Sequence, residues 1–244
     1  LIFLTSPCDY DAVDQLEEIG VVAHKVASFD LPDLDLIRYI AKTQKPILLS
    51  TGLADWMDIQ RAVNVCREEG NEKILLFQCT SLYPAPANLS NLRAINTMRD
   101  AFNLVTGYSD HTLGDNISIV AVAMGASAIE KHFTLDRNLS GPDHAFAIQP
   151  DELKVMVRKI REAEKAFGDG SKSGPREEEM DMYYKARRSL HAASDIKEGM
   201  IINESMLVSK RPGLGIPIHL KRIVIGRVAR RDLKKDQWID WSCI

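Results

Sequence analysis

Short apolar segments alternate with amphipathic segments over about the first two thirds of the chain. Six apolar segments have the length of buried strands: Leu1–Thr5, Val22–Ser28, Pro46–Ser50, Ile74–Gln78, Leu104–Thr106 and Ala128–Glu130. The segments after them predict helices, which run from Asp9 or Asp11 to Glu18 and over Leu34–Ala41, about Asp55–Glu68, Leu92–Ala101, Ile117–Met124 and about Pro150–Phe167. This alternation predicts an α/β fold with a parallel sheet.

The predicted strands end in polar residues, which favours a (β/α)8 TIM barrel over an open sheet. A barrel needs eight strand–helix units, and the sequence supplies six. The chain also opens on the apolar segment Leu1–Thr5, without an initiator Met. We therefore expect a partial barrel that lacks about two units, on the order of 60 residues or more, at its front. Because such a barrel exposes sheet edges, residues 1–244 alone are expected to be inactive and poorly folded.

The pattern changes after the last predicted helix. Gly168–Arg176 has the composition of a linker, and the acidic run Glu177–Glu179 follows it. From about Ala186, short β-branched or apolar pieces alternate with turns; these pieces are Ser189–Ala193, Ile223–Val228 and Trp238–Asp240. We predict a partial barrel over residues 1–168, a linker over 169–185 and a small domain rich in strands and irregular structure over 186–244.

Composition narrows the class of protein. The chain has 244 residues and a net charge of −3, with acidic and basic residues interspersed, so nothing indicates a nucleic-acid footprint. No apolar run approaches the ~18 residues that a membrane span needs, and no signal peptide is visible. The four cysteines show no metal-binding or disulfide spacing, which favours a reducing cytoplasm.

Two histidines follow neighbouring predicted strands. His111 comes soon after Leu104–Thr106, and His132 comes directly after Ala128–Glu130 and one lysine. Because the carboxyl ends of parallel strands form one rim, both imidazoles are expected to face one pocket there. Two histidines this far apart in sequence are more often unrelated, so the argument depends on their place at strand ends. The pair predicts a divalent-metal site.

Six motifs, in order along the chain, give the sequence a family resemblance. They are Lys25-Val26-Ala27-Ser28, Leu49-Ser50-Thr51-Gly52, Tyr83-Pro84-Ala85-Pro86, Ser109-Asp110-His111-Thr112, Glu130-Lys131-His132-Phe133-Thr134-Leu135-Asp136 and Gly141-Pro142-Asp143-His144. Together they resemble the sialic acid synthases, which include the N-acetylneuraminate, pseudaminic and legionaminic acid synthases. The segment from Arg188-Ser189-Leu190 to Lys210-Arg211-Pro212-Gly213 resembles the antifreeze-like (SAF) domain of that family.

The resemblance implies a metal-dependent condensation. Phosphoenolpyruvate would react with an open-chain N-acyl hexosamine, N-acetylmannosamine or a relative, to give a nonulosonic acid and phosphate. A divalent ion, Mn²⁺ or Mg²⁺, held by His111 and His132 would polarise the sugar aldehyde. The family pattern also implies a domain-swapped homodimer.

The resemblance assigns substrate contacts residue by residue. Lys25, Ser28, Ser50 and Ser109 match the family's phosphoenolpyruvate ligands, which suits a substrate with a phosphate and a carboxylate. Ser81 stands where an Asn is common, so a substrate amide contact would be lost or replaced by a hydroxyl. Arg211, in the Lys210-Arg211-Pro212-Gly213 motif, would reach the sugar's N-acyl group in a neighbouring subunit.

Three further residues match the family's catalytic positions. Asp143 corresponds to an acidic residue near the sugar and the water that adds at C2, and Tyr83 belongs to the matching proline-containing loop. Asp30 stands where the family often has Glu and is shorter by a methylene. The family's first-strand Glu and second-strand Lys are expected in the part that precedes Leu1.

Two other functions stay open from the residues. One is a metal-dependent barrel hydrolase in which His111, His132 and Asp143 surround a metal-activated water. Consumption of phosphoenolpyruvate separates this hydrolase from the synthase. The other is a carbohydrate-binding or assembly module on an inert barrel fragment, which would bind sugar without releasing phosphate.

Overall fold

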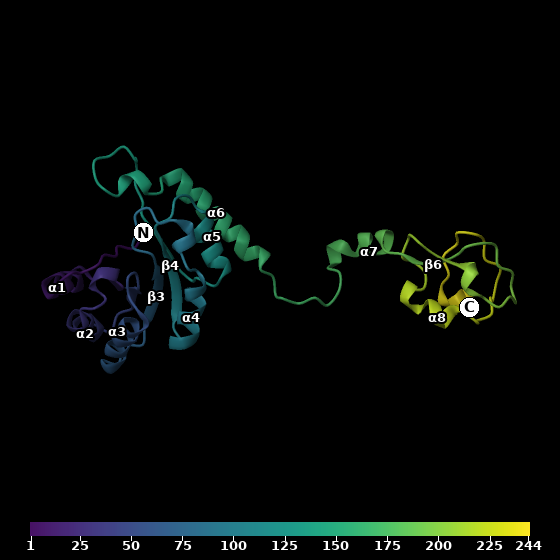
Figure 1. Cartoon of the computed structure of the whole chain (residues 1–244), viewed down its shortest axis with the longest axis horizontal. Coiled ribbons are helices and arrows are strands. Elements are labelled where there is room, and N and C mark those ends of the chain that lie inside the picture. Colours follow the sequence, from purple (N-terminus) through teal and green to yellow (C-terminus); the bar gives the residue numbers. More distant parts are fainter. The chain divides into compact units, whose positions relative to one another are not determined.

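The computed structural model describes all 244 residues, which form two compact units, Leu1–Gly170 and Ser171–Ile244 (Figure 1). The first unit contains a parallel sheet of five strands in the order β1-β2-β3-β4-β5. The strands are β1 (His24–Val26), β2 (Ile47–Ser50), β3 (Ile74–Cys79), β4 (Val105–Asp110) and β5 (Ile129–Lys131). The sheet curls into part of a barrel, which confirms the predicted partial (β/α)8 fold.

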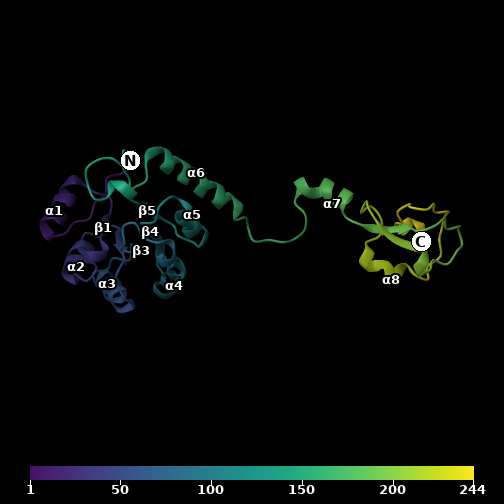
Figure 2. The same cartoon turned by 45° about the horizontal axis from the view of Figure 1, so that its top comes forward.

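Six helices cover this sheet, and Figure 2 shows the first five in an arc around the strands. They are α1 (Tyr10–Ile19), α2 (Leu34–Lys42), α3 (Trp56–Glu68), α4 (Arg93–Phe102), α5 (Asn116–Ala123) and α6 (Pro150–Ala166). The predicted helices are confirmed to within about a residue at their ends. Asp9, Asp33 and Asp55 each accept a hydrogen bond from a first-turn N–H, which fixes three of the starts.

The predicted strand Leu1–Thr5 is wrong. This segment is irregular, and the side chains of Leu1, Ile2, Phe3 and Leu4 are exposed. A strand needs a ladder of backbone hydrogen bonds, and the backbone bond from Lys25 N to Thr5 O, at 3.4 Å, does not make one. The apolar pattern indicated a strand, but the segment shares no sheet register with β1.

Side chains alternate across the sheet and so divide its two faces. On the outer face, Val26, Ile47, Leu49, Ile74 and Leu76 are buried in one apolar cluster with residues of α2, α3 and α4. The residues that point the other way near the carboxyl ends are polar and line a cavity; they include Lys25, Ser50, Cys79, Ser109 and Glu130. The apolar core therefore packs against the outer face of the sheet. Polar side chains lie at the carboxyl end of the inner face, where they line the cavity.

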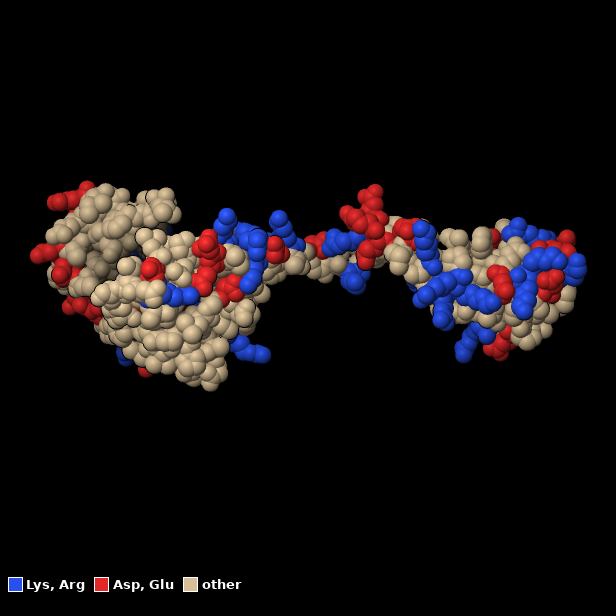
Figure 3. All heavy atoms as spheres, turned by 90° about the horizontal axis from the view of Figure 1, so that it is seen from above, with Lys and Arg blue, Asp and Glu red and all other residues tan.

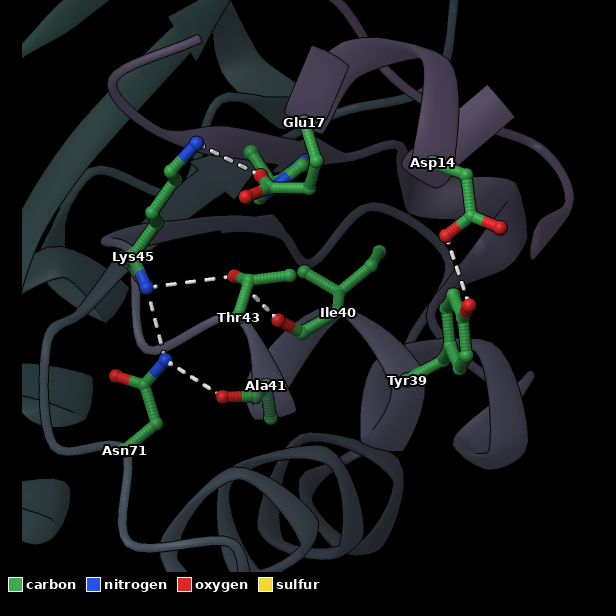
Figure 4. A network of polar contacts seen from close by, with 9 residues as sticks. Asp14, Glu17, Tyr39, Ile40, Ala41, Thr43, Lys45 and Asn71 are labelled. Atoms are coloured by element: carbon green, nitrogen blue, oxygen red, sulfur yellow. Dashed lines mark hydrogen bonds and ion pairs between the residues drawn. The ribbon is translucent and has the colours of Figure 1, made fainter. Parts of the chain in front are cut away.

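Polar contacts tie the amino ends of β1 and β2 to their helices (Figure 4). One oxygen of Glu17, on α1, lies 2.7 Å from Nε2 of the buried His24 and 2.9 Å from Nζ of Lys45. Asn71, before β3, donates from its amide to the carbonyls of Ala41, at 3.2 Å, and Lys45, at 2.9 Å. This network stands at the opposite end of the strands from the polar cavity.

The second unit is small and has little regular structure. It contains α7 (Met180–Ala186), the antiparallel pair β6 (Ser189–Ala192) and β7 (Leu207–Lys210), and α8 (Lys221–Val224). One of the β-branched or apolar pieces, Ile223–Val228, forms no strand: Lys221–Val224 is helical and a single bridge joins Val228 to Ile201. The strand Leu207–Lys210 was missed, because its apolar run is too short to stand out.

Charge is distributed unevenly between the units. Residues 1–170 carry 24 acidic and 16 basic residues, whereas residues 171–244 carry 10 acidic and 15 basic residues. Figure 3 shows Lys and Arg side chains gathered over the carboxyl-terminal unit. The net charge of −3 therefore conceals a basic second unit. None of the helices has the length and apolarity needed to cross a membrane.

Candidate active site

A cavity of about 120 Å³ opens at the carboxyl ends of the five strands. Every strand contributes to it directly or through the residue that follows. Its lining consists of Lys25, Ala27, Ser28, Phe29, Ser50, Cys79, Tyr83, Ser109, His111, Glu130 and His132. The carboxyl rim is where barrel enzymes place their catalytic groups, so this cavity is the candidate active site.

A cation and two hydroxyls meet on one side of the cavity. Lys25 is only 8% exposed, and its Nζ donates to Ser50 Oγ at 2.8 Å. The same Nζ lies 3.4 Å from Glu130 Oε2, and Ser109 Oγ donates to Glu130 Oε1 at 2.6 Å. Donors from β1 and β4 thus converge on the carboxylate of β5. They form a small site suited to anionic oxygens.

The two predicted histidines face each other across the cavity. Their ring centroids are 5.3 Å apart, and the ring planes are inclined at 76°. Nδ1 of His111 lies 2.7 Å from the Thr80 carbonyl oxygen. Because a carbonyl only accepts, Nδ1 carries the proton and Nε2 keeps a lone pair for another ligand.

Aromatic rings and one carboxylate surround the histidines. The Tyr83 ring lies 4.3 Å from that of His111 and 5.5 Å from that of His132, between centroids. Phe146 lies 5.1 Å from His132. Asp143 Oδ2 is 3.6 Å from His132 Nδ1, and the Asp143 side chain is 61% exposed. The carboxylate therefore stands at the solvent side of the second histidine.

Burial and hydrogen bonds shift three pKa values in the cavity. Burial lowers the pKa of His111, but its contacts with the Cys79 thiol and the Thr80 carbonyl outweigh this, so the pKa is raised. Burial opposes ionisation of Cys79, but its contact with His111 outweighs that effect and lowers the thiol pKa. Burial raises the pKa of the Tyr83 hydroxyl, which stays protonated at neutral pH.

The donor set fits a divalent ion held by two imidazoles. The hydrogen bond from His111 Nδ1 to Thr80 O fixes the tautomer and leaves Nε2 as a possible metal ligand. The ring of His132, which follows the next strand, lies beside the ring of His111. No cluster of three or more His, Cys, Asp and Glu side chains surrounds this position. An ion bound here would keep positions open for water or substrate, as catalytic metal sites do.

The structure brings most of the predicted site residues together. Ser28 lines the cavity, and its Oγ accepts a hydrogen bond from Gly52 N at 3.0 Å. Ser81 Oγ is buried beside Gly52 without a hydrogen-bond partner, and a Cβ on Gly52 would stand 2.3 Å from it. A side chain at position 52 would therefore displace the hydroxyls of both serines.

Four predicted residues do not line the cavity: Asp143, which lies beside His132, Ser81, which lies beside Gly52, and Asp30 and Arg211. Asp30 ends the 3₁₀ turn Ser28–Asp30 that follows β1, and it does not line the cavity. Arg211 belongs to the second unit, where it directly follows β7 and its side chain is exposed.

Sequence reasoning missed Glu130 and Cys79 as cavity residues. Strand alternation is the signal that could have found Glu130. It lies two residues before His132, so both point to the same face. Cys79 is the last residue of β3 and occupies the corresponding place on that strand.

A polar cavity at the carboxyl rim of a curled parallel sheet is typical of (β/α)-barrel enzymes. The NeuB family matches residues 1–172, and the SAF domain matches residues 187–244. The chain therefore belongs to the NeuB family, the sialic acid synthases, and this confirms the resemblance seen in the sequence.

Named relatives and a solved structure agree with this assignment. The chain is 44% identical to the N,N'-diacetyllegionaminic acid synthase of Campylobacter jejuni over 98% of its own length and 72% of the relative's. It is 35% identical to a pseudaminic acid synthase of the same species, over 96% and 68%. The crystal structure of the spore coat polysaccharide biosynthesis protein SpsE from Bacillus subtilis matches all of this chain and 73% of that one, with 34% identity and a TM-score of 0.68.

Proposed function

We propose that this protein condenses phosphoenolpyruvate with an open-chain N-acyl hexosamine to form a nonulosonic acid and phosphate. The observation that carries the proposal is the convergence of Lys25 and Ser109 on the Glu130 carboxylate, in the same cavity as the histidine pair. The similarity to synthases of legionaminic and pseudaminic acids supports it.

Lys25, Ser50 and Ser109 are proposed to bind the anionic groups of phosphoenolpyruvate. Lys25 and Ser109 already hold one carboxylate, and Ser50 Oγ accepts a hydrogen bond from Lys25, so the same groups suit phosphate or carboxylate oxygens. Ser28 lies next to them on the cavity wall. Ser81 Oγ is buried without a hydrogen-bond partner, and it would have to turn towards the cavity to donate to a substrate oxygen. The binding of the substrate would then loosen the contacts of Glu130 with Lys25 and Ser109.

The histidines are proposed to hold Mn²⁺ or Mg²⁺, which when bound supplies Lewis-acid polarisation of the sugar carbonyl. His111 serves through Nε2, since Nδ1 donates to Thr80 O. The Tyr83 ring packs against both imidazoles and limits the directions in which they can turn. Asp143 Oδ2 is proposed to accept a proton from the water that adds at C2, because it is exposed beside His132.

We further propose a homodimer in which Arg211 acts in the neighbouring subunit. An exposed guanidinium offers fixed donors to an amide carbonyl such as that of an N-acyl group. The basic character of the second unit suits the approach to an anionic substrate.

The test is a product analysis on the natural full-length protein. Phosphoenolpyruvate and Mn²⁺ are supplied with a panel of N-acyl hexosamines, and phosphate and keto acid are quantified. The proposal predicts one phosphate and one nine-carbon keto acid per phosphoenolpyruvate consumed, only when a sugar is present. Hydrolysis of a substrate without consumption of phosphoenolpyruvate would favour a metal-dependent hydrolase, and sugar binding without turnover would favour a binding module.

A further inference from the structure

The residues that precede the two histidines in the sequence, Asp110 and Lys131, form a buried ion pair. Asp110 ends β4 and Lys131 ends β5, and the two residues are register partners in the ladder between these strands. Lys131 Nζ lies 3.0 Å from Asp110 Oδ2, with the two side chains 5% and 0% exposed. Each residue immediately precedes one of the histidines.

The pair points away from the candidate active site. Because side chains alternate along a strand, Asp110 and Lys131 face the opposite side from Ser109 and Glu130. Neither lines the polar cavity, and Lys131 instead lines a separate cavity of about 330 Å³ on the other side. Neither residue is therefore placed to touch a substrate held between the histidines.

Both residues of the pair hold the backbone around His111, and Asp110 also contacts α5. Asp110 Oδ1 accepts from Thr112 N at 2.8 Å, and Lys131 Nζ donates to Thr112 O at 2.7 Å. Asp110 Oδ2 also accepts from Ser118 Oγ of α5 at 2.5 Å. The residues before and after His111 are thus tied to Lys131, whose next residue is His132.

The second histidine is held by β5 and by a further backbone contact, in which His132 O accepts a hydrogen bond from Ile148 N at 2.8 Å. β5 has three residues and pairs with β4 through three register positions. His132 contacts rings of the cavity wall and lies 3.6 Å from the exposed Asp143. The His132 backbone is therefore held by Ile148 at its carbonyl and, on its amino side, by the contacts that its neighbour Lys131 makes.

We propose that Asp110 and Lys131 are positioning residues that set the separation of His111 and His132, and thereby the affinity for the divalent ion. The proposal rests on the proposed function. A buried ion pair adds little net stability, since desolvation offsets the attraction, and its best-attested role is to fix one geometry. Here the geometry that it fixes is that of the two imidazoles.

The experiment measures Mn²⁺ binding to the natural full-length protein without substrate. Free Mn²⁺ is titrated by electron paramagnetic resonance for wild type, Asp110→Asn and Lys131→Met, and folding is followed by circular dichroism. Loss of outer-shell partners typically weakens metal binding about 10–100-fold, so the Kd is expected to rise by this factor in both variants. Glu17→Gln is the matched control: it breaks a buried-histidine network at the other end of the same sheet and is expected to leave the Kd unchanged (Figure 4).

Each outcome decides the question. A lower melting temperature with an unchanged Mn²⁺ Kd in both variants would overturn the proposal and leave the pair a purely structural role. If a single variant does not fold, the double variant Asp110→Asn/Lys131→Met, which buries no unpaired charge, and Ser118→Ala replace it, with the same expectation of weakened binding. Absence of Mn²⁺ binding by the wild type contradicts both this proposal and the metal in the proposed function. Binding by the wild type without condensation contradicts the proposed function alone.

Discussion

Lys25 and Glu130 belong to the two edge strands of the five-stranded sheet, yet their charged ends lie 3.4 Å apart. A flat sheet would separate its edges by about four interstrand spacings of ~4.8 Å, so this contact requires a strong curl. The curl is what brings donors from β1 and a carboxylate from β5 into one cavity. It also makes the inner face concave, as in a barrel.

Replacing Lys25 with Met tests the anion site. A charge-assisted hydrogen bond contributes roughly 1.5–3 kcal/mol, so Lys25→Met is expected to raise the KM for phosphoenolpyruvate about tenfold or more. The fold should persist, because Met keeps most of the side-chain volume. Steady-state kinetics with varied phosphoenolpyruvate measures the effect, and Lys73→Met, at an exposed lysine, is the control. An unchanged KM would reduce Lys25 to a structural role.

Acid sensitivity of the fold tests the network at the amino ends of the strands. Burial opposes ionisation of Glu17, but hydrogen bonds from Lys45 and His24 outweigh it and hold the carboxyl pKa below its usual 4.5. A depressed folded-state pKa means that Glu17 stabilises the fold above about pH 4.5 and loses this contribution as pH falls through the folded value.

The measurement is the melting temperature of wild type and Glu17→Gln from pH 7 to pH 3. The difference between the two proteins is expected to be largest near neutrality and to shrink as the pH falls below about 4.5. A difference that stays constant over this range would show that the charge of Glu17 contributes nothing.

Subunit complementation tests whether Arg211 acts in trans. Arg211→Ala and His111→Ala homodimers are each expected to be inactive. Mixed dimers should regain activity, because half of their sites combine an intact His111 with an intact Arg211. Arg222→Ala, at another exposed arginine of the second unit, should be active by itself. A mixture that stays inactive while mixed dimers are shown to form would place Arg211 in cis.

The sequence predicted the strand ends better than it predicted the contacts across the sheet. The place of His111 and His132 after adjacent strands was enough to bring them to one rim, since parallel strands share their direction. Alternation along β5 places Glu130 on the same face as His132, but its contacts with Lys25 and Ser109 were not predictable, because no local pattern encodes the curl that joins β1 to β5. Leu1–Thr5 was assigned to a strand on hydrophobicity, which does not report whether a partner supplies hydrogen bonds.

The metal and turnover of a His111→Ala variant test the central claim most directly. Wild type and variant are expressed at full length, loaded with Mn²⁺ and compared for bound metal and for phosphate release from phosphoenolpyruvate with an N-acyl hexosamine. His219→Ala, at an exposed histidine of the second unit, controls for loss of an imidazole in general. The account predicts about one ion per subunit and EDTA-sensitive turnover in wild type and control, and loss of both in His111→Ala. Unchanged metal content and unchanged turnover in His111→Ala would contradict it.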